Sequence, residues 1–184
     1  MSKPTRKNFN KQVQMHLACA TDPFRPAMRH IWFRGGFAYA TDTHILVRNR
    51  IEEISNLTGP EIDLLDGKAI HADVYREILK YNTITVTDDG IECTHANFKA
   101  FYYFAGGMNM PPFEKITQDS ILRPHVPQSR ISFDMQLMQQ LHKALYKSEQ
   151  CIATFKGTSH PIVFESRDPH ISSVGLIMSI YLPE

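Results

Sequence analysis

The feature that most constrains the fold of this chain is a repeated order of predicted elements: a strand, a helix and three further strands. The pattern occurs at residues 68–104 and again at 130–182, and a degraded copy is predicted at 9–51. A unit of this size cannot cover its own apolar face, so each must pack on another. The repeat therefore predicts an α+β protein built from similar β-α-β-β-β units.

Hydrophobic periodicity places the helices and the last strand within the two clear units. A helix is predicted over 73–81 with Asp73 as its N-cap, and a second over 134–147 with Asp134 as its N-cap. Residues 174–182 carry an apolar side chain at every second position. This spacing predicts a long strand with one buried face.

The other predicted strands are short and are separated by turns rich in Gly, Asp and Thr. Between residues 10 and 20 the pattern is compatible with either helix or strand. The predicted short strands are 31–33, 37–40, 44–51, 68–72, 84–87, 91–94, 99–104, 130–133, 151–156 and 161–166.

Three units, of which the first is degraded, suggest an unequal division of the chain. Residues 1–107 are predicted to form a domain of two units, of which the first is degraded. Residues 108–128 hold four of the 11 prolines and show no clear period, which predicts a linker. Residues 129–184 are predicted to form the third unit, which has no partner unit of its own.

Composition is that of a globular protein, with 42% hydrophobic and 21% charged residues among 184. We expect no secretory signal and no membrane span, because no apolar run is long enough. The three cysteines, at 19, 93 and 151, are widely spaced and odd in number. This usage favours reduced thiols in the cytoplasm.

Positive charge is concentrated at the start of the chain. Residues 1–34 carry seven Lys or Arg residues against Asp22 alone, although the net charge of the whole chain is +1. Such a segment is either a solvated tail that aids solubility or an arm that contacts phosphate. If DNA is bound, the candidate residues are Lys3, Arg6, Lys7 and Lys11.

No local motif for catalysis, a metal or a cofactor is present. The sequence has no Gly-rich phosphate loop, no Cys-x-x-Cys pair and no Gly-x-Ser-x-Gly elbow, and its histidines never pair at metal-ligand spacing. We therefore expect a protein that is not an enzyme and that needs no cofactor. A catalytic site assembled from distant residues, such as Asp42, His44 and His95, stays open.

Four segments, in the correct order, resemble the bacterial DNA sliding clamp, the β subunit of DNA polymerase III. Residues 25–31 resemble the family's Arg-Pro-x-Leu-x-x-Ile segment, and residues 37–47 resemble its Ala-Thr-Asp-Gly-His-Arg-Leu signature. Residues 110–116 are similar to Phe-Pro-Asp-Tyr-x-x-Val. Residues 175–182 are similar to the closing Tyr-Val-x-Met-Pro-x-Arg-Leu.

The resemblance implies a non-catalytic factor of DNA replication or repair, with antiparallel sheets on one side and short helices on the other. It implies duplex DNA, polymerase or repair-protein peptides, and further copies of the chain as partners. The implied peptide pocket comprises Thr41, Thr43, His44, Ile45, Leu46, Pro111, Lys115, Ile116, Leu137, Met178, Ser179, Ile180, Tyr181 and Leu182. The alternative is that its apolar members are ordinary strand core.

This sequence departs from the family in ways that affect function. Thr43, Ile45 and Ser179 replace a glycine, an arginine and a proline of the family pattern. The charges of the two predicted helices nearly cancel, so neither offers a basic face for DNA. A clamp-derived scaffold that binds a peptide without DNA is therefore a second interpretation. The third unit either packs on the same domain or pairs with its counterpart in another chain.

Overall fold

The computed structural model describes residues 6–95, 97–127 and 131–180. The first unit contains two short 3-10 helices and three strands, and two helices connect it to the second unit. The segment between residues 10 and 20 forms a 3-10 turn rather than a strand. The elements are η1 (Met15–Ala18), η2 (Pro26–Arg29), β1 (His30–Arg34), β2 (Phe37–Thr41), β3 (Ile45–Arg50), α1 (Ile51–Ile54) and α2 (Gly59–Leu65).

The second unit follows the predicted order of strand, helix and three strands. The N-cap of its helix is His71, two residues before the predicted cap, because the ring of His71 accepts a hydrogen bond from the backbone N–H of Asp73. The prediction of Asp73 as the N-cap was therefore wrong. The elements are β4 (Ala69–His71), α3 (Ala72–Ile78), β5 (Thr83–Val86), β6 (Gly90–His95) and β7 (Phe98–Tyr103).

The third unit contains one helix and three strands, and a further helix precedes it within the predicted linker. Asp134 is confirmed as an N-cap, since its carboxylate accepts a hydrogen bond from the backbone N–H of Gln136 at 2.7 Å. The sequence did not predict the helix at 113–122. The elements are α4 (Phe113–Leu122), α5 (Met135–Ala144), β8 (Cys151–Thr154), β9 (Ile162–Ser166) and β10 (Val174–Ile177).

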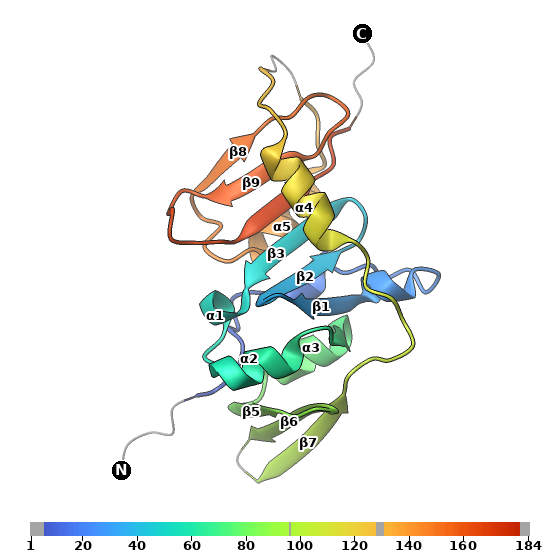
Figure 1. Cartoon of the computed structure of the whole chain (residues 1–184), viewed down its shortest axis with the longest axis vertical. Coiled ribbons are helices and arrows are strands. Elements are labelled where there is room, and N and C mark those ends of the chain that lie inside the picture. The colour runs from blue at the N-terminus through green and yellow to red at the C-terminus, as the bar shows by residue number, and fades with distance from the viewer. Residues whose placement is uncertain (1–5, 96, 128–130, 181–184) are drawn as a thin grey trace.

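The strands form two antiparallel sheets. One has seven strands in the order β4-β1-β2-β3-β10-β9-β8, and the other has three in the order β5-β6-β7. Figure 1 shows the large sheet running through the middle and upper part of the molecule, with the small sheet at the lower end. The α+β class and the repeated units are thus confirmed, and the third unit continues the sheet of the first.

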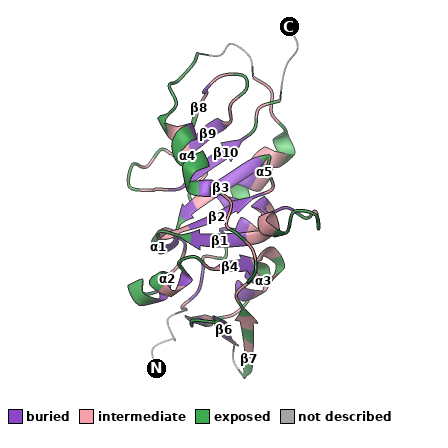
Figure 2. Ribbon diagram, turned by 45° about the vertical axis from the view of Figure 1, so that its right-hand side comes forward, coloured by how far each residue is buried: buried purple, intermediate pink, exposed green. Residues whose placement is uncertain are grey.

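Both faces of the large sheet are covered, which corrects the prediction of a strand with one buried face. All four residues of β10 are buried (Figure 2). Ile177 joins the cluster on the α5 side, whereas Val174 and Leu176 join a second cluster with Phe113 of α4. Regular pairing in β10 ends at Ile177, and Ile180 forms an isolated bridge with Ser132. The last two residues of the predicted strand lie outside the described residues.

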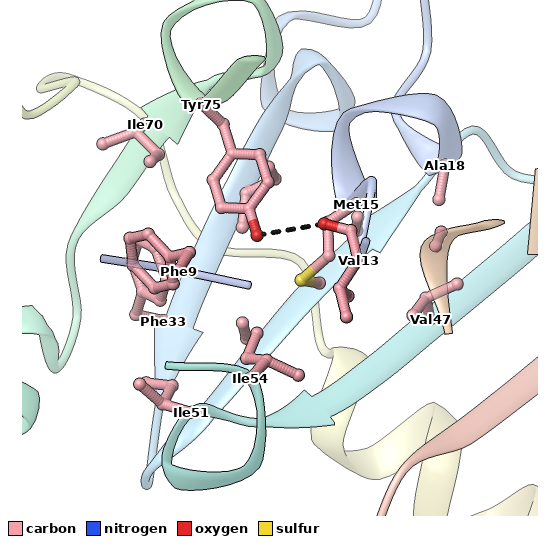
Figure 3. Packing of buried hydrophobic residues seen from close by; sticks show 14 of the residues in the cluster. Phe9, Val13, Met15, Ala18, Phe33, Val47, Ile51, Ile54, Ile70 and Tyr75 are labelled. Carbon is pink, nitrogen blue, oxygen red and sulfur yellow. Dashed lines mark hydrogen bonds between the residues drawn. The ribbon is translucent and has the colours of Figure 1, made fainter. Parts of the chain in front are cut away.

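The main core lies between the helices η1, α3 and α5 and the strands that they cover. Figure 3 shows Phe9, Phe33 and Tyr75 in contact within it, and the hydroxyl of Tyr75 lies 3.4 Å from the carbonyl oxygen of Val13. Phe9 stacks on Phe33 with ring centroids 6.0 Å apart. Each such buried side chain contributes about 1.5–3 kcal/mol. The core therefore fixes residues near the N-terminus within the fold.

The start of the described chain is an integrated segment and not a solvated tail. Asn8 is almost fully buried, and its amide donates hydrogen bonds to the carbonyls of Ile78 and Tyr81. The amine of Lys7 lies 2.7 Å from the carboxylate of Glu61. Burial alone would raise the pKa of Glu61, but the hydrogen bonds from Lys7 and Thr58 outweigh it and hold that pKa below its usual value.

One buried side chain fastens the third unit to the first. The amide of Asn49 in β3 donates to the carbonyl of Ala144 and accepts from the backbone N–H of Tyr146, both at 2.9 Å. Both partners lie at the C-terminal end of α5. Asn49 therefore satisfies backbone groups that the end of the helix would otherwise leave unpaired.

Replacement of this residue should destabilise the protein. Asn49→Ala leaves a buried N–H and a buried carbonyl without partners, and we expect a loss of about 2–3 kcal/mol in the free energy of unfolding. Urea unfolding followed by circular dichroism would measure it. Asn109→Ala, at an exposed loop position, is the matched control and should change stability by less than about 0.5 kcal/mol. Equal stability of the two variants would refute this role.

Acid should weaken the fold through His16. Burial, followed by the charge of Arg76, lowers the pKa of His16 below 6.5. As the pH falls, His16 is therefore protonated in the unfolded chain at a higher pH than in the folded protein. The free energy of unfolding consequently decreases as the pH drops below 6.5. We expect His16→Leu to reduce the difference in unfolding free energy between pH 7.5 and 5.5. His170→Gln, at an exposed position, should leave that difference unchanged, and an unaltered slope in His16→Leu would contradict the assignment.

Candidate functional site

The candidate site is an apolar cavity of about 280 Å³ where the first unit, α4 and the third unit meet. Three larger hollows among the described residues, of about 570, 530 and 330 Å³, are lined mainly by polar and charged residues. The apolar cavity is the better candidate because bound peptides and small molecules are held mostly by apolar walls. Its walls are Met28, Thr41, Thr43, His44, Ile45, Leu46, Pro111, Pro112, Phe113, Ile116, Pro161, Leu176 and Met178.

The turn between β2 and β3 supplies the polar rim of this cavity. The carboxylate of Asp42 accepts hydrogen bonds from the backbone N–H groups of His44 and Ile45, both at 2.8 Å. The hydroxyl of Thr41 donates to the carbonyl of Ile45 and accepts from the N–H of Thr43. These local bonds are typical of Asp and Thr in turns, and they fix the rim before any ligand arrives.

Thr43 adopts a backbone conformation that favours glycine. Its φ is +86°, in the left-handed region, where a β-branched residue is strained. The resemblance to the clamps implies a glycine at this position. Here the Thr43 hydroxyl accepts a hydrogen bond of 2.7 Å from the guanidinium of Arg25. The threonine thus keeps the turn geometry and adds a charged neighbour to the rim.

Helix α4 forms the opposite wall of the cavity. Its first residue, Phe113, is 2% exposed and stacks on Tyr39 of β2 with ring centroids 5.8 Å apart. At the other end, the buried amine of Lys156 donates to the carbonyls of Ile121 and Arg123. That charge compensates the unpaired carbonyls of the helix end. Both ends of α4 are therefore anchored, so the wall that carries Ile116 is fixed.

The structure gathers most of the predicted pocket residues, but not all of them. Lys115 and Ser179 do not line the cavity, and the Ser179 hydroxyl bonds instead to the carbonyls of Thr158 and His160. Leu137 packs against the main core, and Ile180 is half exposed beside Ser132. Tyr181 and Leu182 lie outside the described residues. Those that line the cavity are Thr41, Thr43, His44, Ile45, Leu46, Pro111, Ile116 and Met178.

Several residues that line the cavity were not predicted, although the sequence contains a pattern that could have identified some of them. Leu176 alternates with Met178 along the last strand, so it shares the same side of the chain. Phe113 lies inside the segment that resembles the clamps. Met28 lies in η2, inside the segment 25–31 that also resembles the clamps. Pro161 directly precedes β9, and no spacing in the sequence indicates its position.

Of the predicted DNA-contacting residues that the structure describes, two line a polar hollow and one is paired with a carboxylate. Arg6 and Lys11 line the polar hollow of about 570 Å³, together with several Asn and Gln side chains. Lys7 is held by Glu61, and the guanidinium of Arg6 also donates to the carbonyl of Leu79. Lys3 lies outside the described residues. A basic surface here therefore rests mainly on Arg6 and Lys11.

The helix α3 carries ion pairs that neutralise its surface. Arg76 lies 3.1 Å from Asp73, and Lys80 lies 2.6 Å from Glu77. Each positive charge is thus compensated by a carboxylate three residues earlier, although Lys80 lies just beyond the end of the helix at Ile78. This helix offers no net positive charge to a phosphate backbone.

The residues named for a catalytic site do not converge. Asp42 and His44 are in the β2–β3 turn, whereas His95 lies at the end of β6 beside Glu77 and Tyr81. Within the described residues, no group of three or more His, Cys, Asp or Glu side chains could hold a metal ion. No helix in the same part of the chain is long and apolar enough to cross a membrane.

Comparison with known proteins gives matches in structure alone. No family model and no curated protein matches the sequence. The DNA polymerase sliding clamp of Bacillus subtilis superposes with a TM-score of 0.65 at 14% identity, over 96% of this chain and 64% of that one. The β subunit of Streptococcus pyogenes gives a TM-score of 0.64 at 15% identity, over 99% of this chain and 68% of that one.

A third clamp, from Bartonella birtlesii and bound to griselimycin, superposes with a TM-score of 0.65 at 12% identity, over 99% of this chain and 68% of that one. The chain thus spans about two thirds of the length of the clamps that it matches. Over the part of their length that it spans, the chain has the fold of the bacterial DNA polymerase III β sliding clamps.

Proposed function

We propose that this protein is a non-catalytic, clamp-like tethering factor of DNA replication or repair, which holds an extended peptide of a partner protein. The observation that carries the proposal is the apolar cavity between the β2–β3 turn, α4 and the end of β10. Its floor is aliphatic, and Thr41, Thr43 and His44 supply a polar rim. This arrangement suits a short segment with an aliphatic anchor and a hydrogen-bonding backbone.

The chemistry of the reactive side chains supports a binding role. Burial raises the pKa of all three cysteine thiols, that of Cys93 to about 12, so none is a ready nucleophile. The hydroxyl of Ser148 lies 2.8 Å from a ring nitrogen of His142, but it also bonds at 2.6 Å to the carbonyl of the same residue. The second bond gives Ser148 a structural role, because its hydroxyl pairs with a carbonyl near the C-terminal end of α5. The three cysteines form no disulfide, and this fits the cytoplasmic location that we propose for the protein.

A charge at the rim of the cavity should block the peptide. The side chain of Ile116 is 42% exposed at the cavity edge, so Ile116→Arg adds a charge without disturbing the core. We expect at least about tenfold weaker binding of a fluorescein-labelled hexapeptide with two leucines among serines and glutamines, measured by fluorescence anisotropy. The unlabelled peptide serves as competitor.

The same helix provides the control. Leu122 is 81% exposed on α4 and does not line the cavity, so Leu122→Arg should bind the hexapeptide as the unmodified protein does. Equal affinity of the two variants, with unchanged thermal stability, would reject the cavity as the binding site. No measurable binding by the unmodified protein would reject this class of peptide.

A scaffold that binds a peptide without DNA is the second candidate function. The observation that favours it is the neutralised surface of α3, where Arg76 and Lys80 are both paired with carboxylates. Duplex DNA attracts proteins mainly through unpaired positive charge. If this chain binds DNA, the contact is expected at the N-terminal segment, where Arg6 and Lys11 border a polar hollow.

The salt dependence of binding separates the two functions. For a clamp that contacts phosphate, Arg6→Ala combined with Lys11→Ala should reduce the slope of log K against log salt by about two, since each phosphate contact contributes about 0.9. Lys7 is left intact because it pairs with Glu61. The control variant replaces Lys143 and Lys147 with Ala and should retain the slope. Absent binding to a 20-base-pair duplex would favour the scaffold. Binding with a slope that none of these changes alters would place the DNA contact outside the N-terminal segment.

A further inference from the structure

A second apolar cavity, of about 210 Å³, lies within the third unit. It is bordered by α5, by β8 and β9, and by the segment that connects α5 to β8. These elements lie in the upper part of Figure 1. The residues that line the cavity are Met138, Leu141, His142, Leu145, Ser148, Cys151 and Phe164. All of them come from residues 138–164, so the cavity belongs to the third unit.

The cavity results from the way in which α5 packs on the large sheet. Over β10 the helix is very close, because a Cβ atom at Gly175 would lie only 2.7 Å from the Cδ1 of Leu141. Glycine permits this approach because it has no side chain. From β8, the side chain that lines the cavity is that of Cys151, which is shorter than Leu or Phe. The space that this short side chain leaves between the helix and the strand is the cavity.

The walls of this cavity suit a single aromatic ring. Leu141, Leu145 and Phe164 are 2%, 4% and 7% exposed. A cavity of about 150 Å³ with walls of this kind is large enough to bind benzene. Phe164 and the thioether of Met138 also interact favourably with aromatic rings. Volume and walls therefore favour an aromatic ligand over an aliphatic chain.

One side of the cavity is polar, and its hydrogen bonds leave an acceptor available. The hydroxyl oxygen of Ser148 lies 2.6 Å from the carbonyl oxygen of His142 and 2.8 Å from the Nδ1 of the same residue. A carbonyl can only accept, so the single hydroxyl proton is directed to it and Nδ1 is the donor. The serine oxygen thus retains a second lone pair. The thiol of Cys151 donates to the carbonyl of Ser148 at 3.4 Å and holds this segment in place.

We propose that this cavity binds a small monocyclic aromatic molecule that carries one hydroxyl group. The ring packs between α5 and Phe164, and the hydroxyl donates to the oxygen of Ser148. Leu141 and Phe164 belong to the core cluster on the α5 side of the large sheet, whereas Leu176 of the peptide cavity belongs to the cluster on the α4 side. The two cavities therefore lie on opposite faces of the sheet, and each can be tested separately.

Methionine methyl groups report which cavity is occupied in the unmodified protein. Met138 lines the cavity of the third unit, whereas Met28 and Met178 line the peptide cavity. With phenol as the ligand, we expect a saturable shift of the Met138 methyl resonance in the NMR spectrum of methyl-labelled protein. The dissociation constant should be on the order of 1 mM or tighter for a ligand of this size. The resonances of Met28 and Met178 should keep their positions.

Filling the cavity should abolish binding without weakening the fold. Cys151→Leu adds apolar volume where the short thiol leaves space, so it should weaken phenol binding at least about tenfold in titration calorimetry. Its thermal stability should be equal or higher, because a filled cavity stabilises a protein. Ala153→Leu is the matched control. Ala153 is an exposed residue of the same strand and does not line the cavity, so this variant should bind phenol as the unmodified protein does.

A second variant tests the hydroxyl and does not require the fold to accept a larger side chain. Ser148→Ala removes the acceptor, so phenol should bind at least about fivefold more weakly. Toluene has the same number of non-hydrogen atoms and no O–H group, and its affinity should change by less than about twofold. An equal loss for both compounds, or a loss for neither, would contradict the assignment of the ligand hydroxyl to Ser148.

Three further results would overturn the proposal. The first is a Met138 resonance that does not move at up to about 10 mM phenol. The second is a shift confined to Met28 and Met178, which would place phenol in the peptide cavity. The third is a folded Cys151→Leu variant that binds phenol with unchanged affinity. Hexapeptide binding takes part in none of these measurements, so this proposal and the proposed function can fail separately.

Discussion

The antiparallel pairing of β3 with β10 is the interaction on which the rest of the structure depends. It joins strands more than a hundred residues apart, as the bond between Arg48 and Ser172 with a separation of 124 shows. The entropy lost in closing so long a loop must be recovered by contacts that only the closed state makes. The ladder supplies them, together with the buried amide of Asn49 and the carboxylate of Glu53, which accepts from Ser172 and Ser173. The third unit thereby becomes part of a continuous sheet.

The candidate cavity exists because this junction is covered by a helix from the connecting segment. β10 brings Leu176 beside Leu46 of β3, and α4 crosses the same face with Phe113 stacked on Tyr39. Figure 1 shows α4 on this face of the sheet. The cavity is the space left between the helix and the strand ends. A ligand there would contact the first unit, the connection and the third unit together, so peptide binding and the docking of the third unit should stabilise each other.

The candidate site could be predicted in part, because its rim is local and its walls are not. The turn that carries Thr41 and Thr43 is defined by hydrogen bonds between residues at most four positions apart, and such signals are visible in a sequence. Leu137 shows the limit. It was assigned to the pocket by resemblance, but α5 directs it into the core on the opposite face of the sheet. The hydrophobic character of a residue shows that it will be buried, and only the packing of elements decides against which face.

The sequence by itself determined the α+β class, the repeat of β-α-β-β-β units and the cap at Asp134, because each depends on short-range periodicity and local hydrogen bonds. Tertiary structure alone decided that α4 forms within the proline-containing connection, where the apolar face of the large sheet required a cover. It also decided that β10 is buried on both faces and that pairing stops at Ile177. An alternating pattern reports which side chains share a face. It does not report whether a helix from elsewhere in the chain covers the other face, since that depends on contacts between residues far apart in the sequence.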